Sequence, residues 1–174
     1  STGMLQSFLD AMLDRACVLY IVDPEAIAQC VQAGVDATLD LEVGAKASPL
    51  QGKPCRMRAE VVSLGDGRFR YDGPMYEGAE GHMGLSAHIR QDGIHVLLVS
   101  EREQPFDTAF ARSMGLDPRQ MRHIGVKSAA HFRAGFEAWA GAIYPVSEHS
   151  VHHPAEGALV FRRLGRKLYP FDDI

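Results

Sequence analysis

Two short apolar runs, residues 17–22 and 94–99, most constrain what this chain can fold into. Runs of this length and composition are typical of strands that are buried on both faces of a sheet. Each run leads toward a helix signal: Asp23 and Pro24 follow the first, and Asp107 follows the second after a polar segment. Strands that feed helices in this way predict an α/β domain with a parallel portion in its sheet.

Between these two units the pattern changes to alternation. Residues 38–43, 56–61 and 85–89 alternate apolar and polar side chains, as half-buried strands do. The Asp92-Gly93 dipeptide is a tight-turn signal, so the run 94–99 is expected to pair with the preceding strand as an antiparallel hairpin. The sequence therefore predicts one α/β domain over residues 1–174, with a mixed, partly antiparallel sheet flanked by helices.

Composition limits the classes of function. The chain is 46% hydrophobic and 23% charged with a formal net charge of -4, as in ordinary globular proteins. Basic residues are scattered except near residues 162–167, so we expect no nucleic-acid partner. No stretch approaches the roughly 20 apolar residues of a membrane span, and no leader is apparent, so a soluble cytoplasmic protein is expected. The cysteines Cys17, Cys30 and Cys55 lack metal-ligand or disulfide spacing and are expected to be buried thiols.

The strongest chemical signal is the turn that follows the apolar residues 124–126. It contains Lys127, Ser128, His131 and Arg133, and aromatic residues then recur at helical spacing up to Trp139. Ser128 is therefore expected to be a helix N-cap. In an open α/β sheet such a turn lies at the carboxyl end of a strand, where ligands usually bind. The alternative is that Ser128 only caps the helix and the other side chains face water.

A second polar segment follows the apolar run 94–99. It contains Arg102, Gln104 and Asp107, and Asp107 is expected to be the N-cap of a helix that carries Phe110 and Met114. If both strands belong to the parallel portion of the sheet, their turns share one edge and form one polar wall.

Together the two turns suit an anionic or peptide-like ligand. Lys127 and Arg133 can hold a carboxylate, and Gln104 can donate to and accept from an amide group. The imidazole of His131 can exchange a proton near neutral pH. These residues do not form a complete hydrolytic site by themselves.

The other histidines give weaker signals. His149, His152 and His153 lie close together in the sequence without a carboxylate or cysteine at ligand spacing, so they are expected to be an incidental surface cluster. His88 alternates with polar residues and is expected to be exposed. His95 lies within an apolar run and is expected to be a hydrogen-bonded core or interface residue. No metal is expected to bind to this chain.

These motifs resemble the C-terminal domain of the MlrC family, which are microcystin-degrading, metallopeptidase-like proteins. The resemblance is carried mainly by residues 100–107 and 126–134, and also by residues 114–118 and 168–172. Upstream segments agree in kind: Asp23-Pro24-Glu25-Ala26, Gly73-Pro74-Met75-Tyr76 and Met83-Gly84. The sequence departs from the family pattern at His82 and Phe171.

The resemblance implies a zinc-dependent peptidase or amidohydrolase whose metal is held by an N-terminal domain absent from this chain. The chain would then be inactive alone, and its partners would be that N-terminal domain and a small peptide-like substrate, with a homo-oligomer left open. Its start at Ser1-Thr2-Gly3 without methionine also leads us to expect part of a longer protein. In this interpretation His131 is the catalytic residue, and the substrate-binding residues are Lys127, Ser128, Arg133, Gln104, Asp107 and Arg102.

The alternative is a non-catalytic structural or docking domain. Its turns would orient the N-terminal partner, and Lys127 and Asp107 would form ion pairs inside the protein. The two interpretations differ in whether the polar side chains of the turns face solvent or a packed interior.

Overall fold

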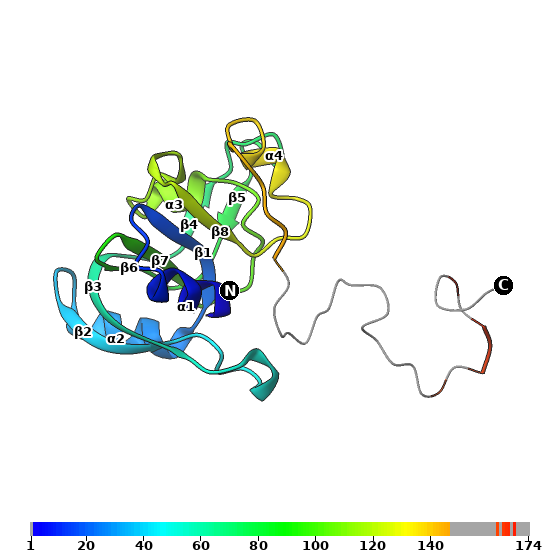
Figure 1. Cartoon of the computed structure of the whole chain (residues 1–174). Coiled ribbons are helices and arrows are strands. Elements are labelled where there is room, and N and C mark those ends of the chain that lie inside the picture. Colours follow the sequence, from blue (N-terminus) through cyan, green and yellow to red (C-terminus); the bar gives the residue numbers. More distant parts are fainter. Residues whose placement is uncertain (1, 147–162, 164, 168, 170–174) are drawn as a thin grey trace.

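The structure, a computed structural model, describes residues 2–146, 163, 165–167 and 169. Its centre is a six-stranded sheet with the strand order β2-β3-β6-β7-β1-β8 (Figure 1). The strands of this sheet are β1 (Ala16–Val22), β2 (Thr38–Val43), β3 (Cys55–Gly65), β6 (Ser86–Gln91), β7 (Ile94–Val99) and β8 (His123–Val126). A separate two-stranded ribbon consists of β4 (Arg68–Arg70) and β5 (Glu80–His82).

The sheet is mixed, as the sequence predicts. β1 lies between β7 and β8 and is parallel to both. The pairs β2–β3, β3–β6 and β6–β7 are antiparallel. The expected hairpin forms between β6 and β7, and Asp92 adopts the positive φ of 51° that its tight turn requires. Because β7 and β8 flank β1 in the same direction, their carboxyl ends lie at one edge of the sheet.

The helices are α1 (Thr2–Asp10), α2 (Pro24–Ala33), α3 (Ala109–Ser113) and α4 (Arg133–Phe136), with 3₁₀ turns η1 (Pro49–Gln51) and η2 (Pro118–Gln120). α1 and α2 lie on one side of the sheet, and α3, α4 and the β4–β5 ribbon lie on the other (Figure 1). Among the residues described, no helix combines the length and the apolar composition of a membrane span.

Each side of the sheet has its own hydrophobic cluster. Alternate residues of the central strands enter different clusters, so that Val18 and Val96 pack with α1 and α2, while Leu19 and Leu97 pack with α3 and α4. β1 and β7 are therefore buried on both faces, which explains their almost continuous apolar sequence. The three cysteines are also buried, as predicted, and burial raises the pKa of the Cys17 thiol to about 12.

The first β–α unit begins as its sequence predicts. An oxygen of the buried Asp23 carboxylate accepts the Ala26 N–H at 3.0 Å, and Pro24 occupies the first turn of α2. The other oxygen accepts the Gly44 N–H at 2.7 Å, and Lys46 Nζ lies 3.0 Å from the carboxylate. Asp23 thus caps α2 and also fixes the loop between β2 and β3.

Two expected N-caps differ in the structure. Ser128 Oγ accepts the Phe132 N–H at 3.2 Å, but α4 begins only at Arg133 and contains a single turn. Thr108, not Asp107, occupies the N-cap position of α3. Asp107 lies one residue before it, and its carboxylate accepts the Ala109 N–H at the start of the helix. Short helices of this kind are held by tertiary packing, since one turn has little stability of its own. The segments 147–162 and 170–174 lie outside the described residues.

Candidate functional site

The two polar turns meet at the carboxyl edge of the parallel strands. His131, after β8, and Gln104, after β7, are joined by a contact of 2.7 Å between His131 Nδ1 and Gln104 Oε1. An amide oxygen accepts hydrogen bonds, so Nδ1 carries the hydrogen in this pair, and in the neutral ring the lone pair is then on Nε2. The sequence places these residues far apart, and the order β7-β1-β8 brings them together.

α4 packs directly on the backbone of the other turn. A Cβ atom built on Gly135 would lie 2.5 Å from the carbonyl oxygen of Phe106 and 3.5 Å from the Cα of Asp107. Only glycine permits this approach. The close packing fixes the distance between the segment 104–107 and the turn that carries His131.

The basic side chains of the turns lie on an open surface. Lys127 and Arg133 are exposed, as are Arg102, Gln104 and His131, whereas Ser128 is half-buried. Arg133 forms an ion pair with Glu137, and its guanidinium carbon lies 5.5 Å from the centre of the Phe132 ring. The Lys127 ammonium forms no ion pair with another described residue, although its backbone N–H donates to Leu19 O at 3.2 Å.

Asp107 is the member of the predicted set that is turned inward. Its side chain is 4% exposed, and its two oxygens accept the backbone N–H groups of Gly73 and Ala109. The carboxylate therefore connects the loop 71–79 to the start of α3. Lys127 and Asp107 do not form an ion pair with each other, in contrast to what the structural-domain alternative predicts.

A group of aromatic side chains beside Asp107 was missed by the sequence reasoning. Tyr71 and Phe106 stack at 5.3 Å, and Tyr76 lies 5.5 Å from Phe106 between ring centres. Burial, with the negative charges of Glu103 and Asp107, raises the pKa of Tyr71 to about 12. Burial likewise raises the pKa of Tyr20, a further member of the surrounding core, well above its ordinary value. Of the segment that carries Tyr76, the sequence analysis noted residues 73–76 as part of the family resemblance, without a predicted function.

His88 is buried, in contrast to the exposure that its alternation predicts. It is 1% exposed, its Nδ1 lies 3.1 Å from Met114 O, and its Nε2 lies 2.9 Å from His95 Nδ1. α3 and the residues after it cover this face of β6, so the polar side chain of His88 is shielded from solvent. The prediction of a hydrogen-bonded His95 is confirmed.

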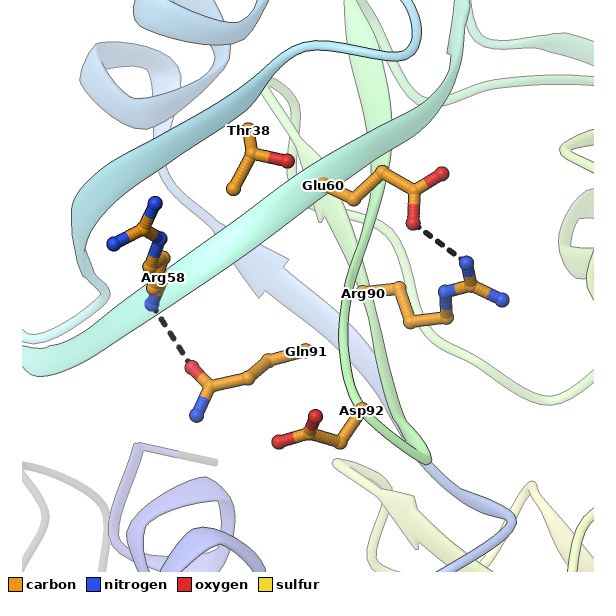
Figure 2. A pocket seen from close by; sticks show the side chains of 6 residues that line it. All are labelled: Thr38, Arg58, Glu60, Arg90, Gln91 and Asp92. Atoms are coloured by element: carbon orange, nitrogen blue, oxygen red, sulfur yellow. Dashed lines mark hydrogen bonds and ion pairs between the residues drawn. The ribbon is translucent and has the colours of Figure 1, made fainter.

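A separate hollow lies at the opposite end of the strands from these turns. It is shallow and open, with a volume of about 450 Å³, and its lining comes from β2, β3, the end of β6 and the turn that follows (Figure 2). Figure 2 shows the Arg90–Glu60 ion pair, at 2.6 Å, and the hydrogen bond from the Arg58 N–H to the side chain of Gln91. The hollow is adjacent to the turn at Asp92, and so lies at the amino end of β7. It contains no residue predicted for the site.

Metal ligands do not gather in the described part of the chain. Residues 2–146 and the few described beyond them contain no group of three or more His, Cys, Asp or Glu side chains that could hold an ion. His82 and Glu101 form a solvent-exposed pair at 3.1 Å, and no third ligand joins them among the described residues. The cluster of His149, His152 and His153 lies outside the described residues.

Comparisons with known proteins identify one matching family model and similar proteins among curated sequences and solved structures. The family model described as "MlrC C-terminus" matches residues 1–163. Among curated proteins, Microcystinase C from Sphingomonas sp is 25% identical over 175 residues, covering 99% of this chain and 32% of that protein. Among solved structures, a crystal structure named "putative metallopeptidase" from Mesorhizobium sp. BNC1 has a TM-score of 0.77 at 20% identity. It covers 100% of this chain, which spans 35% of that structure. The chain is thus about one third as long as either relative.

Proposed function

This chain belongs to the MlrC C-terminus family, and on that premise we propose that it is one domain of a metal-dependent peptidase or amidohydrolase. In this proposal the domain supplies substrate-binding and supporting groups from the carboxyl edge of β7 and β8. The observation that carries the proposal is the His131–Gln104 contact of 2.7 Å, which joins two exposed turns beside Lys127 and Arg133. The length and name of the Mesorhizobium structure agree with a second, preceding domain.

Each side chain has a defined role in the proposed site. Gln104 holds the His131 ring so that Nε2, with its lone pair, can accept a proton from a substrate or from a water molecule. Lys127 and Arg133 bind a carboxylate or a polarised carbonyl of a peptide-like substrate. Asp107 supports the site from inside by joining the loop 71–79 to the start of α3, which follows the segment that carries Gln104.

The metal of the proposed enzyme is not assigned to this chain. The described residues offer no suitable cluster of ligands. We propose that zinc, with the water it activates, is held by the N-terminal domain. A cytoplasmic location is part of the same proposal.

The test measures kcat/KM in the complete protein, using a panel of short linear peptides and mass spectrometry of the products. His131→Ala is expected to lower kcat/KM about 100-fold, the size of a lost acid–base contribution. Lys127→Ala is expected to lower it about 10-fold, as for the loss of a charge-assisted hydrogen bond.

Matched controls come from the same chain. His123→Ala removes an exposed imidazole at the other end of β8, and Lys53→Ala removes an exposed ammonium far from the edge. Both are expected to retain the wild-type kcat/KM. If His131→Ala and Lys127→Ala behave like these controls, the two residues have no part in catalysis and the domain is a structural or docking unit.

A further inference from the structure

An aromatic side chain is presented to solvent beside the candidate site. We define the aromatic platform as Tyr71, Tyr76 and Phe106. Tyr71 and Phe106 stack nearly parallel, with an interplanar angle of 14°, and are only 7% and 5% exposed. Tyr76 packs against both, with ring centres 6.0 Å and 5.5 Å away, but is 64% exposed. The platform therefore has a buried base and one solvent-facing ring.

The loop that carries Tyr76 is held in place by several contacts. Tyr71 N–H donates to Ala79 O at 3.0 Å, and Gly78 N–H donates to Tyr71 O at 2.8 Å, which closes the loop. The Asp107 carboxylate holds Gly73 from the other side. Tyr76 itself has a φ of 60°, a backbone conformation that bulky residues rarely adopt. Strain of this kind persists only where surrounding contacts impose it, and it is enriched at ligand-binding positions.

The platform adjoins the proposed site through the backbone. Phe106 N–H donates to Gln104 O at 3.0 Å, and the Gln104 side chain contacts His131. α4 packs against the other side of Phe106 through Gly135. The aromatic platform and the proposed site thus share the backbone segment 104–106.

We infer that the Tyr76 ring is a subsite that binds an apolar or aromatic side chain of the peptide-like substrate. This inference rests on the proposed function of the carboxyl edge. An aromatic ring that is already fixed loses little conformational entropy on binding, and ring stacking adds to the burial of apolar area. The negative charges of Glu103 and Asp107 near the platform disfavour an acidic side chain at this subsite.

The test measures binding, so that it does not depend on turnover. Ligand-observed NMR gives the Kd of two probes, N-acetyl-phenylalanine amide and N-acetyl-glycine amide, for the complete protein. The wild type is expected to prefer the phenylalanine probe about five-fold or more, and Tyr76→Phe is expected to keep that preference. Tyr76→Ala and Tyr76→Asn are expected to reduce the preference to less than two-fold. Asparagine is included because it tolerates positive φ, so this variant removes the ring while retaining the loop conformation.

Two further variants separate this inference from the proposed function. Tyr144→Ala removes another exposed tyrosine outside the platform and is expected to leave the preference unchanged. His131→Ala is expected to lower kcat/KM for the short linear peptides, while the protein still prefers the phenylalanine probe over the glycine probe. A wild type without preference, or a preference that survives both Tyr76→Ala and Tyr76→Asn, overturns the subsite. Loss of the preference in the Tyr76 variants, with normal kcat/KM in His131→Ala, supports the subsite and rejects the catalytic role of His131.

Discussion

At the scale of single residues, burial decides what an ionisable side chain can do. His88 has the same chemistry as the exposed His131, but it is enclosed between β6 and the residues after α3. Its hydrogen bonds satisfy a neutral ring, since Nδ1–H donates to Met114 O and Nε2 accepts from His95. A proton added to His88 would have to lie in this enclosed site close to Arg90. The residue therefore serves stability and is not available for proton exchange with a ligand.

Acid is expected to destabilise the domain through His88. Burial, the neighbouring His95 and the Arg90 charge lower the pKa of His88 to about 4, whereas an unfolded histidine has a pKa of about 6.5. The unfolded chain then binds more protons, so His88's stabilising contribution is complete above pH 6.5 and is lost as the pH falls toward 4. The loss is on the order of 3 kcal/mol.

Urea unfolding at several pH values between 7.5 and 4.5 measures the free energy of unfolding. His88→Gln is expected to show a shallower fall of stability with pH than the wild type, because the titrating group is gone. His123→Gln, at an exposed position, is expected to follow the wild type. Equal slopes for His88→Gln and the wild type would show that His88 does not drive the acid sensitivity.

Asp107 is expected to be essential for stability. Asp107→Ala leaves the half-buried Gly73 N–H and the buried Ala109 N–H without their acceptor and releases the loop 71–79, at a cost of about 2–3 kcal/mol. Asp66→Ala is the control, since this exposed carboxylate also accepts a backbone N–H but is expected to contribute less than about 1 kcal/mol. Urea midpoints at pH 7.5 compare the two. Similar losses in both variants would contradict the buried role of Asp107.

At the scale of elements, α4 depends on where it packs. The segment after β8 contains aromatic residues at helical spacing, yet only one helical turn forms. Phe136 is buried in the cluster below α3, and the Trp139 Nε1–H donates to Gly135 O at 2.8 Å. These contacts hold the segment against Phe106 and thereby set the position of His131.

Gly135→Ala is expected to displace α4. The new methyl group would overlap the Phe106 carbonyl at 2.5 Å, and overpacking of this kind costs about 1–3 kcal/mol. Gly141→Ala is the matched control, because nothing lies within 4 Å of its Cβ position. Urea unfolding gives the stabilities, and NMR of the His131 ring reports whether its contact with Gln104 survives. A Gly135→Ala variant as stable as Gly141→Ala would mean that α4 is not packed tightly on this turn.

At the scale of the whole molecule, two hydrophobic clusters share their central strands. β1 and β7 contribute alternate side chains to both sides of the sheet, so a mutation that destabilises one cluster also destabilises the other. The domain is therefore expected to unfold as one cooperative unit. The two turns at the carboxyl edge follow β7 and β8, the strands that flank β1 in this sheet.

A mutation in one cluster is expected to be detected from the other. Ile27→Ala creates a cavity beside α1 and α2, with an expected loss of about 2–5 kcal/mol. Trp139, the single tryptophan, lies against the opposite cluster, so its fluorescence reports unfolding there. Fluorescence and far-UV circular dichroism are expected to shift together to the same lower urea midpoint. Separate transitions for the two signals would show that the clusters unfold independently.

The sequence alone determined the features that depend on neighbouring residues. Apolar runs identified β1 and β7, Asp23 and Pro24 marked the start of α2, and Asp92-Gly93 fixed the hairpin. Periodicity and turn chemistry act over a few residues, so they can be recognised without the fold. The same local signals located the segments that carry Gln104 and His131, and the parallel strands placed both segments at one edge.

Tertiary structure decided which polar groups reach solvent and which side chains meet. The alternation of apolar and polar residues in β6 predicts an exposed His88, because a pattern within one strand carries no information on what packs against it. In the structure α3 and the residues that follow it cover that face. The inward Asp107 and the ring of Tyr76 depend on contacts between segments about 30 residues apart. Burial and contact are properties of surfaces formed by distant parts of the chain, and no local pattern encodes them.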